Sequence, residues 1–268
     1  VLSIIDEYIP KLNDKNIHQV VQYYLCNNGH LKQQIINYYG QISNWDVSQV
    51  TNMKKLFEMR IEFNEDISNW NVSNVTDMFA MFHGAESFNQ PLDNWDVSKV
   101  TKMHGMFAYA ESFNQPLNSW NVSNVKTMED MFYSAVSFNQ PLNNWNVSKV
   151  FHMEHMFHSA KNFNQPLNNW DVSNVRLMDH MFAYTQYFNQ PLNDWNISNV
   201  EIFDFMFSGA TSFNQPLNDW NVSNNVYQHC MFIDARSFNM HENAPWYMYI
   251  KADFRRNLLI RIGMPHLY

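Results

Sequence analysis

A tryptophan recurs every 25 residues along this chain, and this spacing restricts the fold more than any other feature. It holds through eight copies without an insertion or a deletion. Self-similarity at a fixed period is typical of stacked repeats, in which each copy contacts only its neighbours. We therefore expect one elongated repeat domain rather than two globular ones. The positions are Trp45, Trp70, Trp95, Trp120, Trp145, Trp170, Trp195 and Trp220.

Two apolar patterns follow one another in each copy. In the third copy, Trp95 and Val97 alternate with polar residues, which is the period-two pattern of a strand with one buried face. The apolar residues of the segment Val100–Ala110 then recur at helical spacing, and Ser98 could cap that helix. These patterns predict an α/β solenoid of eight 25-residue strand–helix coils, with parallel strands on one side and helices on the other.

A helical cap is expected at the N-terminal end, residues 1–41, because an open stack must cover its first coil. Apolar residues at helical spacing predict one helix that begins after Asn13 or Asp14 and stops at Gly29. The same pattern predicts a second helix that ends at Gly40.

The repeats are expected to occupy residues 42–239 and a C-terminal helical cap residues 240–268. After Pro245 an apolar residue recurs at every fourth position, which predicts a helix. Its other faces are basic, so it could dock on the acidic repeats or contact a partner. The basic residues concerned are Arg255, Arg256 and Arg261.

The repeats resemble a known family. From Trp95 to Leu117 the chain reads Trp-Asp-Val-Ser-x-Val-Thr-x-Met-x-x-Met-Phe-x-x-Ala-x-x-Phe-Asn-x-Pro-Leu. This run closely resembles the BspA-like leucine-rich repeats, specifically the 25-residue type of mycoplasma surface lipoproteins, other bacterial surface proteins and large DNA viruses. The resemblance implies a right-handed, leucine-rich-repeat-like solenoid with a role in adhesion or protein interaction. It also implies no enzymatic activity, and it supplies no catalytic residue.

The charge of the repeats argues against nucleic acid as a partner. Residues 41–238 hold 20 of the 25 acidic side chains but only 10 of the 17 basic ones, a net charge of −10. Such a surface repels phosphate backbones.

Compartment is predicted from weaker signals. Cys26 and Cys230 lie near opposite ends of the stack, too far apart to pair. Unpaired thiols, together with the fact that no leader is seen in this sequence, favour a virion or a host cytoplasm over a bacterial cell surface; whether a leader precedes Val1 is left open. No apolar run is long enough to predict a transmembrane segment.

Repeats distinguish positions that maintain the coil from positions that are free to encode a partner. The constant tryptophans and the asparagine after each phenylalanine belong to the first kind, and the asparagine amides are expected to satisfy backbone groups of tight turns. We therefore assign a structural ladder to Trp95, Trp120, Trp145, Asn114, Asn139 and Asn164.

The predicted helices carry the variable positions. Copies four to seven stack an acidic row beside histidines, which is the most distinctive patch in the chain. A partner-binding surface and a merely solvated face both fit this pattern. The residues are Glu129, Glu154, Asp179, Asp204, His155, His158 and His180.

Neither an active site nor a cofactor is expected. The chain has no Gly-rich phosphate loop, no nucleophile elbow and no Cys/His motif at ligand spacing. His152, His155 and His158 are three residues apart, so on a helix they drift around the axis, and no metal site is predicted there.

The sequence thus predicts a non-catalytic scaffold for protein–protein interaction, and the resemblance makes a large DNA virus one candidate source. One alternative is a structural virion component or a cell-surface adhesin that presents the regular strand face. A further alternative is a metal-binding protein that uses the histidines on the helix face.

Overall fold

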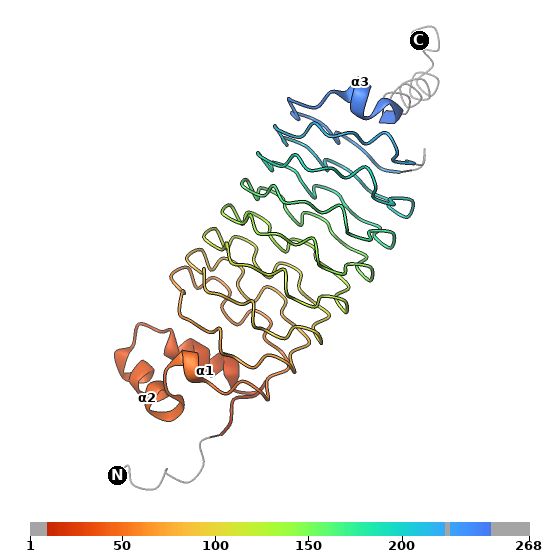
Figure 1. Ribbon diagram of the computed structural model, residues 1–268. Coiled ribbons are helices and arrows are strands. Elements are labelled where there is room, and N and C mark those ends of the chain that lie inside the picture. The colour runs from red at the N-terminus through yellow and green to blue at the C-terminus, as the bar shows by residue number, and fades with distance from the viewer. Residues whose placement is uncertain (1–9, 223–225, 248–268) are drawn as a thin grey trace, which may run out of the picture.

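The repeats form successive coils stacked along one axis. The computed structural model describes residues 10–222 and 226–247. Helices α1 (Ile17–Tyr24) and α2 (Gly29–Tyr39) lie at one end, followed by the short 3-10 helix η1 (Ile42–Asn44). The four-residue helix α3 (Met240–Asn243) lies at the other end (Figure 1). We number the coils by their tryptophans, so that coil one contains Trp45 and coil eight contains Trp220.

Parallel pairing joins the coils at one position in each, seven residues after the tryptophan. The pairs run without a break from Asn52↔Asp77 to Ile202↔Tyr227. Backbone hydrogen bonds extend this contact. Within Met78–Gly84, the N–H group of every second residue donates to a carbonyl of the next coil, at 2.8 to 3.0 Å. Stacking in register is therefore fixed by the backbone itself.

The helix predicted in each copy is not what the structure has. Within the described coils, the segment instead forms two consecutive four-residue turns. In coil three, Met106 N–H donates to the Met103 carbonyl at 3.1 Å, and Ala110 N–H donates to the Phe107 carbonyl at 3.0 Å. Each turn contains one residue with a positive φ, Gly105 at 62° and Tyr109 at 57°. An α-helix has no place for such residues.

The strand predicted around each tryptophan is not formed either. Trp95 and Val97 are buried and Asp96 between them is exposed, so burial alternates as the pattern predicted. The parallel pairing nevertheless lies further along the coil, at Lys102. The right-handed, leucine-rich-repeat-like winding remains a prediction.

Aromatic columns fill the interior. One column joins Phe57 to Phe232, one phenylalanine per coil, with ring centroids 5.5 to 5.7 Å apart. A second joins Phe63 to Phe238 at 5.6 to 6.0 Å. Within a coil the two phenylalanines stack at 4.0 to 4.2 Å. The interior is thus a continuous apolar rod, to which each coil adds the same layer.

The N-terminal helices cover the first coil, and their ends differ in detail from the prediction. Gly29 begins α2 rather than stopping α1, because Asn28 caps α2 by accepting from the N–H groups of His30 and Leu31. Asp14 does not cap α1. Its carboxylate accepts from the N–H groups of Thr51 and Asn52 and from the Thr51 hydroxyl. Asp14 therefore ties the cap to coil one.

Trp246 extends the tryptophan column beyond the eighth coil. It stacks on Trp220 with ring centroids 6.4 Å apart, and its indole N–H donates to the Leu217 carbonyl at 2.8 Å. The basic residues Arg255, Arg256 and Arg261 lie outside the described residues. In the part of the chain that the structure describes, no helix combines the length and the apolar character needed to cross a membrane.

Candidate functional site

The two turns of each coil bring four side chains to one surface. They lie 9, 10, 13 and 14 residues after the tryptophan, and they differ from coil to coil. We call this surface the variable face. In coil four it consists of Glu129, Asp130, Tyr133 and Ser134. The positions 10 and 14 residues after the tryptophan are those with positive φ in all eight coils.

The constant asparagines hold neighbouring coils together. The side-chain oxygen of Asn114 accepts from the Asn139 N–H at 2.9 Å and from the Gln140 amide at 3.1 Å. Asn139 does the same for Asn164 and Gln165 one coil further on.

The tryptophans link the coils as well. The indole N–H of Trp95 donates to Ile67, that of Trp120 to Leu92 and that of Trp145 to Leu117, in each case to a carbonyl of the preceding coil. All three indoles are buried. These side chains are thus occupied in stacking.

The uniform polar residues beside the tryptophans are also engaged in local contacts. The Asp96 carboxylate accepts from the Ser98 N–H at 3.0 Å, and Asn146 and Asp171 accept from Ser148 and Ser173 in the same way. These hydrogen bonds form side-chain turns that reverse the chain.

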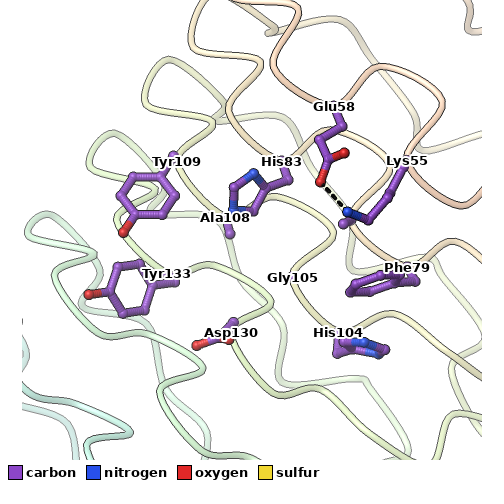
Figure 2. A pocket seen from close by; sticks show the side chains of 11 residues that line it. Lys55, Glu58, Phe79, His83, His104, Gly105, Ala108, Tyr109, Asp130 and Tyr133 are labelled. Carbon is purple, nitrogen blue, oxygen red and sulfur yellow. Dashed lines mark ion pairs between the residues drawn. The ribbon is translucent and has the colours of Figure 1, made fainter.

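A groove of about 330 Å³ opens on the variable face of coils one to four (Figure 2). On one side of the groove the rings of Phe79 and His104 stack 3.9 Å apart, and the ammonium group of Lys55 lies 5.5 Å from the Phe79 ring. On the other side Tyr109 and Tyr133 lie 5.1 Å apart. Aromatic rings therefore lie on both sides of the groove, and Lys55 is paired to Glu58 at 2.7 Å.

Coils four to seven bring the predicted acidic and histidine residues together. His155 Nδ1 lies 3.5 Å from Asp130 Oδ1, and His155 Nε2 lies 3.9 Å from Asp179 Oδ2. His180 Nδ1 lies 3.5 Å from the same Asp179 oxygen. His158 stacks on Tyr133 at 4.5 Å. Glu129 and Asp204 lie at the two ends of this acidic row.

Burial and neighbouring charges within this cluster shift the pKa values of two of its side chains. Burial, together with the carboxylates of Glu129, Asp179 and Asp130, raises the pKa of Glu154 to about 7. Burial, together with the neighbouring His155 and His180, lowers the pKa of His158 to about 4. Charge is thus unfavourable at both side chains.

Sequence reasoning missed an aromatic band that runs along this face from coil two to coil eight. Ring contacts run between successive coils at centroid distances of 3.9 to 6.2 Å. The signal was present as aromatic residues at variable positions, but they do not recur in the same column. The band comprises Phe79, His83, His104, Tyr109, Tyr133, His155, His158, His180, Tyr184, Phe205 and His229.

Stacked coils with constant inner columns and one variable face define a repeat protein. A family model described as "Mycoplasma protein of unknown function, DUF285" matches residues 27–145 and again residues 131–246. The two matches together cover most of the chain, and the chain belongs to this family. This agrees with the mycoplasma repeat part of the resemblance seen in the sequence. No match was found among curated proteins or among solved structures.

Proposed function

We propose that this protein is a non-catalytic scaffold whose variable face binds a protein partner rich in basic side chains. The observation that carries the proposal is an imbalance of charge. The variable face of coils four to seven holds five carboxylates and no Lys or Arg. A basic partner surface complements such a face and is steered towards it. The five are Glu129, Asp130, Glu154, Asp179 and Asp204.

Exposed aromatic residues supply the anchors of the proposed interface. Tyr109 is 42% exposed and Tyr184 is 52% exposed, although both are large. Tyrosines of this kind often carry much of the binding energy of a protein interface, because they bury large areas at low entropic cost. The groove beside Tyr109 adds a concave surface into which a partner side chain can fit.

The arrangement of the carboxylates favours binding over catalysis. They form a row that repeats along the stack, whereas acid–base chemistry needs groups placed around one reacting centre. The leucine-rich-repeat-like winding, adhesion and residence in a virion or host cytoplasm are predictions from the resemblance and the composition.

The test combines charge reversal with a matched control. A partner is first captured with the wild-type chain, identified and purified, and its affinity is then measured by calorimetry at two salt concentrations. The face variant is Glu129→Lys/Asp204→Lys, and the control is Asn94→Lys/Asn144→Lys, at exposed positions beside the tryptophans. Circular dichroism checks that each variant is folded.

We expect the face variant to weaken binding at least about tenfold, and added salt to weaken the wild-type complex. The control should bind as the wild type does. Loss of binding in the control alone would mean that the partner binds the polar residues beside the tryptophans, and it would overturn the proposal.

A further inference from the structure

Three side chains at the centre of the variable face converge on one point. His155, Asp179 and His180 each offer one ligand atom, and the three atoms lie within 4.8 Å of one another. No other group of three or more His, Cys, Asp or Glu with this property occurs in the described part of the chain. The group differs from the trio His152, His155 and His158, which lies within one coil, because its members come from two successive coils.

The coil stack fixes the two histidines relative to each other. His155 and His180 occupy the same position in coils five and six, each ten residues after its tryptophan. The His155 N–H donates to the Asp179 carbonyl at 2.9 Å, and the His180 N–H donates to the Asp204 carbonyl at 2.8 Å. Their backbones are therefore held by the same hydrogen bonds that stack the coils, which preorganises the ligand set.

The distances are close to those of a tetrahedral metal site. Bonds of about 2.0–2.1 Å to Zn²⁺ place neighbouring ligand atoms about 3.3–3.4 Å apart. His180 Nδ1 is 3.5 Å and His155 Nε2 is 3.9 Å from Asp179 Oδ2. The ligand atoms of His155 and His180 lie within 4.8 Å of each other, so side-chain rotations have to bring these two closer.

The surroundings of the histidines also suit a metal. Asp130 Oδ1 lies 3.5 Å from His155 Nδ1, the nitrogen that does not face Asp179. A carboxylate in that position favours the tautomer with Nδ1–H and leaves Nε2 free to coordinate. His180 Nδ1 is buried and makes no hydrogen bond. The Asp179 carboxylate lies 3.5 Å from this nitrogen without forming a hydrogen bond, and a metal ion held between the two would be bound by both.

We propose that His155, Asp179 and His180 bind one divalent transition-metal ion, with Zn²⁺ the best fit to two imidazoles and one carboxylate. Neutral imidazole and carboxylate ligands suit Zn²⁺, and the fourth position is available to water. On coils four to seven this face holds five carboxylates and no Lys or Arg, which provides the negative field that a cation needs. The site spans coils five and six, so a bound ion links them. The proposal does not depend on the existence of a protein partner.

The experiment is a calorimetric titration of the purified full chain, freed of metal with a chelator, with ZnCl₂ near neutral pH. We expect one Zn²⁺ per chain. His180→Ala and Asp179→Asn should each weaken binding at least about 100-fold, because each removes one of three ligands. His152→Ala is the matched control, since His152 is an exposed neighbour outside the set, and its affinity should stay within about twofold of the wild type.

A second readout reports the geometry. Cobalt(II) bound in place of zinc should give the visible absorption of a four-coordinate site in the wild type and in His152→Ala, and lose it in Asp179→Asn. Asp179→Asn is nearly isosteric, so it answers the question if His180→Ala fails to fold. Three results would overturn the proposal: no saturable binding, unchanged affinity in both ligand variants, or an equal loss in His152→Ala. None of these variants changes Glu129 or Asp204, so the partner test is separate.

Discussion

The constant columns and the variable face satisfy their polar groups in opposite ways. In the asparagine column, each side-chain oxygen from Asn64 to Asn214 accepts from the backbone of the next coil at 2.9 Å. On the variable face, buried polar atoms of His83, His104, Glu154 and His180 make no hydrogen bond. Among the described residues, only Gln228 adds buried side-chain atoms of this kind.

The difference separates positions that stabilise the stack from positions that are free to vary. In a column the same side chain makes the same contacts in every coil, so each added coil gains the same contacts with its neighbour. The variable face departs from repetition and leaves groups unpaired, at a cost that the columns offset. Unsatisfied groups in a native structure often mark binding sites, which is why we propose binding at this face.

The largest expected effect is in the tryptophan column. Trp145 is 2% exposed, lies between Trp120 and Trp170 with ring centroids 6.5 and 6.4 Å away, and donates to the Leu117 carbonyl. Trp145→Ala should lower the free energy of unfolding by about 3–5 kcal/mol, measured by urea denaturation. Tyr184→Ala on the variable face is the control and should cost less than about 1 kcal/mol. Equal losses of stability in the two variants would mean that the tryptophan column and the variable face contribute equally to stability.

The asparagine column should show the next largest effect. Asn139→Ala leaves the Asn164 N–H and the Gln165 amide without their acceptor. We expect a loss of about 1–3 kcal/mol in the free energy of unfolding, with faster hydrogen exchange at the Asn164 amide. Asn144→Ala, which removes an exposed side chain five residues away, should change little. If the two variants are equally stable, the asparagine column does not contribute to stability, and the tryptophans rather than the asparagines hold the coils in register.

On the variable face we expect a substitution to increase stability, and this increase should depend on pH. Because the pKa of Glu154 rises from its ordinary 4.5 to about 7, the folded chain holds this proton more tightly than the unfolded chain. The stability that the protonated group contributes is complete below pH 4.5 and is lost as the pH rises through 7. Glu154→Gln lacks this loss.

In the presence of a chelator, we expect Glu154→Gln to gain roughly 1–2 kcal/mol of stability over the wild type between acid and mildly alkaline pH. Thermal unfolding at both pH values measures the change. A constant difference between the two proteins would mean that Glu154 is not desolvated in the native state.

Sequence reasoning found the period and the inner columns but not the local structure of the coil. Met103, Met106 and Ala110 are spaced as on a helix, yet the spacing arises from two consecutive turns, each closed by a bond from residue i+3 to residue i. A four-residue turn and a helical turn place apolar residues at nearly the same intervals, so periodicity cannot separate them. The glycine positions could have indicated turns instead of a helix. Three of the six glycines, Gly84, Gly105 and Gly209, fall at the two positions with positive φ.

The sequence identified some residues of the candidate site, and their role stays a prediction. The acidic row and the three histidines were identified because they vary where other positions do not. The stacking of these histidines beside the acidic row was predicted from the period. The ligand set was missed, because the only histidine trio tested for metal spacing, His152, His155 and His158, lies within one copy. The stack places His155 instead beside His180, which is 25 residues later. The contacts of Asp130 and Tyr133 were missed for the same reason. Only the turn geometry brings them to the same surface as Glu129.

The smallest effect concerns the backbone of the variable face. Ser134 has a φ of 53°, a conformation that costs a residue with a Cβ about 1–2 kcal/mol, whereas glycine adopts it freely. Glycine also loses more entropy on folding, so Ser134→Gly should gain only about 0.5–1 kcal/mol in urea denaturation. Ser137→Gly, whose φ is not positive, should lose a similar amount. Opposite signs would mean that the variable face retains costly side chains where glycine is better for stability, as expected of residues selected for contact. Equal losses would mean that these turns carry no such cost, and the unpaired polar groups alone would then distinguish the face from the columns.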